Sequence, residues 1–63
     1  MKVSKLKDFL IHLGIGETQA ETILSTSTSY EDLIEQVRHY LHLINAPVER
    51  AIIRLKNFIH NER

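Results

Sequence analysis

The sequence predicts an all-α protein, folded as a compact orthogonal bundle of four helices in one domain that covers residues 1–63. Three observations lead to this prediction. Apolar residues recur at helical spacing in four separate stretches of the chain. Both glycines fall in one short turn and the single proline in another, so helix breakers occur only between stretches. There are no cysteines, so a chain this short depends on helix packing, self-association or a partner for its stability.

The first helix is expected over residues 4–13, with Ser4 as a candidate N-cap. Gly14 ends it, because a left-handed backbone conformation costs glycine little. In the turn that follows, Ile15 is expected to enter the core. Gly16 then leads into the next helix, where exposed backbone N–H groups could hold a phosphate or carboxylate. One apolar stripe supports the helix: Leu6, Phe9, Leu10 and Leu13.

The second helix is expected over residues 17–25, and Ala20, Ile23 and Leu24 form its inward face. Alanine is small, so this helix can approach its neighbour closely. Residues 25–29 are all serine or threonine, and this composition predicts a solvent-exposed loop.

The third helix is expected over residues 31–44. Thr28 and Glu31 have the spacing of a capping box, which is the best helix-start signal in the chain. No glycine or proline interrupts the stretch, so one long helix is expected. A fold with five helices would require a break near Gln36.

The last helix is expected over residues 47–60. Pro47 suits the first turn of a helix, and Asn45 or Ala46 would then be the N-cap. The predicted core combines the inward faces of all four helices and the turn: Leu6, Phe9, Leu10, Leu13, Ile15, Ala20, Ile23, Leu24, Leu33, Val37, Leu41, Ile44, Val48, Ile52, Leu55 and Ile59.

Composition narrows the classes of function. Eight basic and eight acidic residues give a formal net charge of zero, whereas duplex DNA binding usually needs a basic face. No apolar run is long enough to span a bilayer, and we expect a soluble cytoplasmic protein. No catalytic constellation is present, and so small a chain has little room for a water-excluding pocket, so we expect no enzyme, cofactor or small-molecule substrate. His39 and His42 have a chelating spacing, but two ligands do not make a metal site, and none is expected.

The turn and the helix after it resemble a helix-hairpin-helix motif. The resemblance is carried by Leu13, Gly14, Ile15, Gly16, Ala20, Ile23 and Leu24. It implies contacts with the DNA backbone, without sequence specificity, through the amides of Gly14, Gly16 and Thr18. Arg50 and Arg54 on the last helix would add a basic patch. Many such domains pair two hairpins, and the second would be residues 43–52, where Asn-Ala-Pro replaces the glycines.

A second resemblance covers about residues 6–43 and is to three-helix ubiquitin-associated-like domains, with the C-terminal domain of the bacterial protein RuvA as the nearest pattern. It is carried by Leu10, Leu13, Gly14, Ile15, Ala20, Leu33 and Ile34. It implies a protein-binding surface made by the first turn and the third helix, with Gly14, Ile15, Gly16, Tyr40 and Leu43 in contact.

We therefore expect a non-catalytic protein-interaction module that binds another protein or a second copy of itself. The alternative is a module that binds the DNA backbone. A five-helix sterile-alpha-motif arrangement is a third possibility. Ile11 and Ile53 fall off the main stripes of their helices and would form an association patch if they converge.

Overall fold

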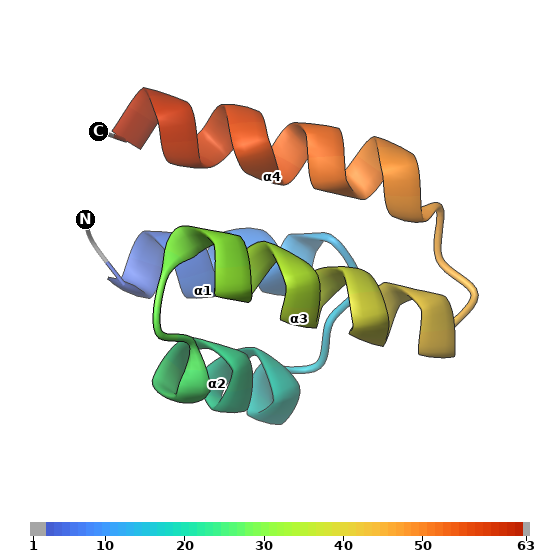
Figure 1. Ribbon diagram of the computed structural model, residues 1–63. Helices are drawn as coiled ribbons and strands as arrows, with labels where there is room; N and C mark the ends of the chain where they lie inside the picture. The colour runs from blue at the N-terminus through green and yellow to red at the C-terminus, as the bar shows by residue number, and fades with distance from the viewer. Residues whose placement is uncertain (1–2, 63) are drawn as a thin grey trace.

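Four helices make up the part of the chain that the computed structural model describes, residues 3–62 (Figure 1). They are α1 (Val3–His12), α2 (Glu17–Thr26), α3 (Tyr30–Leu43) and α4 (Val48–Glu62). This range contains no β-strand. The expectation of an all-helical protein is thus confirmed. Because α3 runs without a break through Gln36, no fifth helix forms there.

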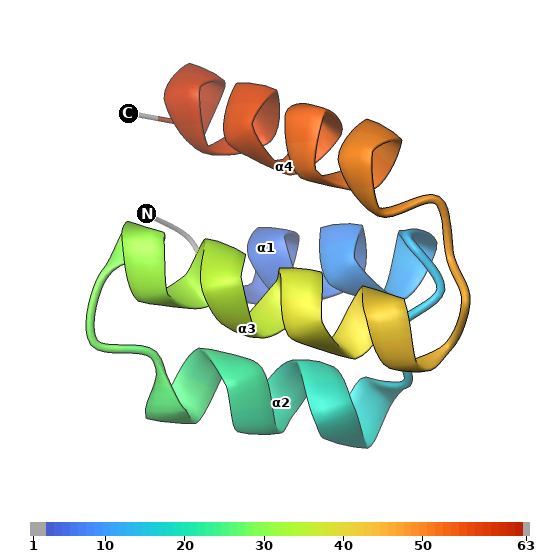
Figure 2. The same ribbon diagram turned by 45° about the vertical axis from the view of Figure 1, so that its right-hand side comes forward.

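The helices are stacked in three levels. In both views, α1 and α3 lie between α2 on one side and α4 on the other (Figures 1 and 2). The α1–α2 and α3–α4 turns lie together at one end of the molecule, and the first turn of α1 and the last turn of α4 lie at the opposite end. The chain is therefore two consecutive helical hairpins placed side by side.

The core draws apolar side chains from all four helices and from the first turn. Its members are each at most 6% exposed: Leu6, Leu10, Ile15, Ala20, Ile23, Leu33, Val37, Leu41, Ala51, Ile52, Leu55 and Ile59. At its edge the rings of Phe9 and Phe58 are stacked with centroids 4.6 Å apart, which ties α1 to α4. Most of the predicted core is therefore confirmed by the burial of these side chains.

Some predicted core residues lie elsewhere. Phe9, Leu13, Leu24 and Val48 are only partly buried and pack against the edge of the core. Ile44 is 41% exposed, so its assignment to the core was wrong. It is the C-cap of α3, with a φ of −98°, and its side chain therefore leaves the inward stripe of that helix.

The first hairpin is closed by a Schellman motif centred on Gly14, which has a φ of +103°. The Gly14 N–H donates to the carbonyl of Ile11 (3.0 Å), and the Ile15 N–H donates to the carbonyl of Leu10 (3.2 Å). Ile15 and Leu10 are both buried, which is the apolar contact that accompanies this motif. Gly14 thus ends α1 as the sequence predicted.

The second hairpin closes in the same way around Asn45, which has a φ of +57°. Its N–H donates to the carbonyl of His42 (3.2 Å), and the Ala46 N–H donates to the carbonyl of Leu41 (3.0 Å). Asn45 was expected to be a possible N-cap of the last helix, and this was wrong. It ends α3 instead, because asparagine tolerates the left-handed conformation better than most residues.

The two hairpins match position for position, 31 residues apart in sequence. The buried residue before the first turn, Leu10, corresponds to Leu41, and the buried residue after it, Ala20, corresponds to Ala51. The residues that follow the positive-φ positions, Ile15 and Ala46, correspond as well. The first bond of each second helix corresponds too: Ala20 N–H donates to the carbonyl of Gly16, and Ala51 N–H to that of Pro47. The fold is a structural repeat, although only the first turn contains glycine.

Helix starts differ slightly from those predicted. The N-cap of α3 is Ser29, whose Oγ accepts from the Asp32 N–H at 3.1 Å, so the pair Thr28 and Glu31 was one residue too early. The Asp32 carboxylate in turn accepts from the Thr28 N–H. At the other end of the chain, α1 begins at Val3, which puts Ser4 inside the helix rather than at its cap.

Candidate functional site

The α2–α3 connection is mostly exposed, as the sequence predicted, and it is also held by side-chain hydrogen bonds. The hydroxyl of Thr26 donates to Gln36 Oε1 (3.0 Å). Gln36 Nε2 donates to the carboxylate of Asp32 (3.0 Å) and, at 3.4 Å, to the hydroxyl of Ser27. Because Thr26 ends α2 and Gln36 lies in the middle of α3, these bonds fix the two helices relative to each other.

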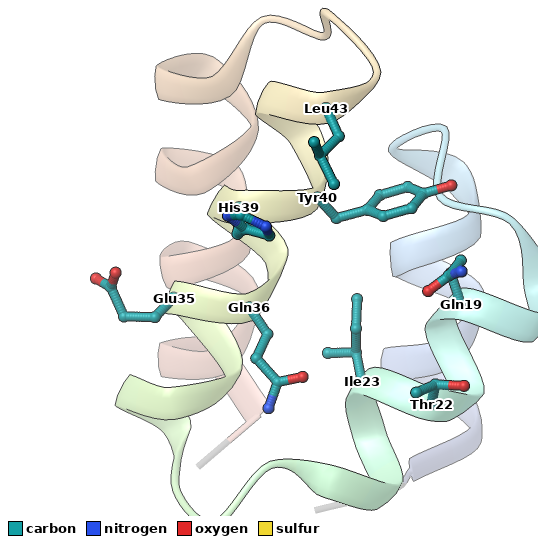
Figure 3. A pocket seen from close by; sticks show the side chains of 8 residues that line it. All are labelled: Gln19, Thr22, Ile23, Glu35, Gln36, His39, Tyr40 and Leu43. Atoms are coloured by element: carbon teal, nitrogen blue, oxygen red, sulfur yellow. The ribbon is translucent and has the colours of Figure 1, made fainter.

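Beside this connection, α2 and α3 enclose an open groove of about 420 Å³. Figure 3 shows the side chains that line it, three from α2 and five from α3: Gln19, Thr22, Ile23, Glu35, Gln36, His39, Tyr40 and Leu43. Ile23 is only 4% exposed and forms the floor. Tyr40 and Leu43 project from α3 above it (Figure 3). The groove is therefore apolar along its centre.

Leu43 is the most exposed large apolar residue in the described part of the chain, at 69%. It belongs to the last turn of α3, where the next residue, Ile44, is also 41% exposed. Single exposed apolar residues are normal on a protein surface. Leu43 lines the groove and Ile44 does not, so Leu43 is the exposed apolar side chain that lies against the apolar groove, an arrangement typical of contact sites.

The polar edge of the groove carries one carboxylate. Glu35 is 72% exposed and has only a loose contact with Arg38, at 3.8 Å within the same helix. The other groove residues with polar side chains are amides, a threonine, a tyrosine and His39. A ligand in this groove would therefore meet apolar groups at the centre and a negative charge at the edge.

The carboxylates of α2 are engaged on its other side. Lys7 Nζ of α1 contacts the carboxylates of Glu21 (2.6 Å) and Glu17 (3.2 Å). The hydrogen bond to Glu21 is the main cause of a raised pKa of Lys7, above its usual value of 10.5, and the hydrogen bond to Glu17 is the second cause. This cluster ties α1 to α2 and stays outside the groove.

The residues predicted to bind a partner are divided by the structure. Tyr40 and Leu43 line the groove, as described above. Ile15 is 1% exposed, so its side chain stabilises the turn from within and is not part of the surface. Gly14 and Gly16 are exposed, with open space where a Cβ would project. The predicted surface therefore separates into the exposed turn and the α3 side of the groove.

Sequence reasoning missed the α2 side of the groove. Gln19 and Thr22 lie on the opposite edge from Tyr40, and Ile23 had been assigned only to the core. The sequence contained one indication of this surface: Gln19, Thr22 and Ile23 are spaced three and four residues apart and therefore lie on one face of α2.

The residues predicted for DNA binding also lie in two groups. Thr18 is exposed in the first turn of α2, and its carbonyl accepts from the Thr22 hydroxyl. Arg50 and Arg54 are on α4, where they line a separate hollow of about 100 Å³ with His12 of α1. The arginines are thus associated with the end of α1 rather than with Thr18.

No group of three or more histidine, cysteine or acidic side chains able to hold a metal occurs within residues 4–61. None of the four helices, as far as they are described, is both long and apolar enough to cross a bilayer. The comparisons with protein-family models, curated proteins and solved structures found no match to this chain.

Proposed function

We propose that this chain is a non-catalytic protein-interaction module and that its α2–α3 groove binds an amphipathic helix of another protein. One observation carries the proposal: Leu43, at 69% exposure, extends an apolar groove whose floor is Ile23 and whose wall is Tyr40. Both helices that form the groove are held in place by Gln36 before any partner arrives. A groove of fixed shape lowers the entropic cost of binding.

The shape and chemistry of the groove favour a helical ligand. Two packed helices leave a furrow between them, and an amphipathic helix fits such a furrow with apolar residues spaced three or four apart. Complete burial of a leucine side chain is worth about 1.5–3 kcal/mol, so covering Leu43 would contribute about 1–2 kcal/mol. A lysine or arginine on the ligand would lie opposite the carboxylate of Glu35.

The resemblance to ubiquitin-associated-like domains agrees with this proposal in part. It covers α1 to α3 and implies contacts from the third helix, where Tyr40 and Leu43 are found. On this interpretation the first three helices are the binding unit of an orthogonal bundle. Helix α4 is then an addition that covers the core on the side of α1 and α3 facing away from α2.

Selection from a library of amphipathic helical peptides tests the proposal. We expect selected peptides to shift the amide resonances of Ile23, Gln36, Tyr40 and Leu43. We also expect Leu43→Asp to weaken binding at least tenfold. The matched control is Ile53→Asp, since Ile53 is 60% exposed on α4 and lies outside the groove.

The proposal fails if no selected peptide depends on Leu43, or if binding is lost equally in the Ile53 variant. Sedimentation of the chain alone provides a separate check. A dimer that Leu43→Asp dissociates would show that a second copy, rather than another protein, occupies the groove.

A further inference from the structure

The zero net charge of this chain conceals an uneven distribution of charge among the helices. Helices α2 and α3 together carry five carboxylates and one arginine. The exposed surface of α4, in contrast, carries three cations, Arg50, Arg54 and Lys56, and one carboxylate, Glu49, as far as its side chains are described. Since α2 and α4 lie on opposite sides of the α1–α3 level, the basic surface is separated from the α2–α3 groove (Figure 2).

Part of this basic surface is hollowed. His12 from the last turn of α1 and Arg50 and Arg54 from α4 line one hollow of about 100 Å³. Its other lining residues are uncharged: Leu13, Pro47 and Ala51. No carboxylate contributes to the lining, so the two arginines have no neutralising partner within the hollow.

The two arginines have no ion pair or hydrogen bond with any described residue, unlike Lys7 and Arg38. Each guanidinium therefore presents its full set of five N–H donors. Arg50 and Arg54 are four residues apart on a helix, so their side chains project from the same face. Both arginine side chains also line the hollow.

The hollow suits one particular ligand chemistry. It is a small surface hollow of about 100 Å³, lined by two arginines and no carboxylate, so its charge favours a small anion such as an oxyanion. Guanidinium groups bind the oxygens of phosphate in pairs, with a geometry that a simple point charge lacks. The hollow also adjoins the first turns of α4, whose positive end favours an anion; the carboxylate in that turn, Glu49, does not line the hollow.

From this arrangement we infer that the hollow formed by His12, Arg50 and Arg54 binds a phosphate group, either free or within a nucleic-acid backbone. The inference is independent of the proposed peptide groove, which uses other residues on α2 and α3. It also differs from contacts with the turn amides, because its donors are side chains of α1 and α4.

Titrations followed by NMR test the inference. Potassium phosphate is compared with potassium chloride at equal ionic strength, and then with short single-stranded and duplex DNA. We expect saturable shifts centred on His12, Arg50 and Arg54. Arg54→Gln should weaken phosphate binding at least tenfold, while Lys56→Gln, an equal charge change on the same helix outside the hollow, should change it less than twofold.

The DNA arms separate the two sources of phosphate. If the backbone of nucleic acid is the ligand, DNA binds more tightly than phosphate, and Arg50→Gln and Arg54→Gln each reduce the salt slope by about 1. If free phosphate is the ligand, DNA gives no gain. The inference is overturned if Lys56→Gln weakens phosphate binding as much as Arg54→Gln does. It is also overturned if Gly16→Glu, which alters the α1–α2 turn, abolishes binding while the arginine variants leave it unchanged.

Discussion

Gly14 and Asn45 occupy the same position in two successive hairpins, each as the positive-φ residue of a Schellman motif that ends a helix. Both turns therefore need a residue with a positive φ, which is a glycine in the first turn and an asparagine in the second. This equivalence gives direct predictions about the two glycines and the asparagine.

The two glycines are expected to respond in opposite ways to substitution. Gly14 has a φ of +103°, so Gly14→Ala should lower the free energy of unfolding by about 1–2 kcal/mol through backbone strain alone, because no atom obstructs a Cβ. Gly16 has a φ of −63° at the N-cap of α2, where no side chain caps the helix. Gly16→Ser should therefore raise the free energy of unfolding by about 0.5–1 kcal/mol. Urea denaturation measures both, and equal losses in the two variants would contradict the assigned conformations.

Asn45→Gly is expected to stabilise the second hairpin by up to about 1 kcal/mol, because glycine adopts a positive φ without the penalty that a Cβ brings. Asn45→Val should destabilise it, since a β-branched residue is strained at this φ. Thermal unfolding followed by circular dichroism reports both changes. A loss of stability in Asn45→Gly would show that the asparagine side chain has a structural role of its own.

Neighbouring residues at the end of α3 are expected to differ sharply. Leu41 is fully buried, so Leu41→Ala should cost about 2–5 kcal/mol and leave a chain this small largely unfolded. Ile44 is 41% exposed, so Ile44→Ala should cost well under that amount. Chemical denaturation of the two variants measures the difference. If Ile44→Ala destabilises the chain as much as Leu41→Ala, Ile44 belongs to the core, and this would contradict its exposure of 41%.

The contacts of Lys7 with Glu17 and Glu21 predict a dependence of stability on pH. The folded-state pKa of Lys7 is raised above 10.5, so its contribution is fully present below pH 10.5 and is lost as the pH rises through the folded-state pKa. Lys7→Met should therefore lower the unfolding midpoint at neutral pH, and the deficit relative to the unsubstituted chain should vanish in strong alkali.

Lys5→Met is the matched control for that experiment, because Lys5 lies on the same helix, is exposed and makes no ion pair with a described residue. Its midpoint should follow that of the unsubstituted chain at every pH. An Lys7→Met deficit that persists above the pKa would assign the effect to packing of the lysine stem instead.

Local signals in the sequence were sufficient for much of the fold. The apolar stripe through Leu6 and Leu10 and the glycine that follows it define α1 and its end, because helical periodicity and a left-handed terminus are short-range properties. The capping position of α3 was missed by one residue. Ser29 and Thr28 both have capping side chains, and only the backbone geometry distinguishes them.

The sequence by itself thus determined four amphipathic helices, the order in which they follow one another and most of the residues they bury. The tertiary structure decided which surfaces are available for binding, namely the α2–α3 groove and the hollow between α1 and α4. It left Leu43 exposed beside Ile23, and it brought His12 to the same hollow as Arg54. The physical reason is that helical periodicity says which way a side chain points from its own helix. Which distant helix it then meets depends on how the helices pack against each other.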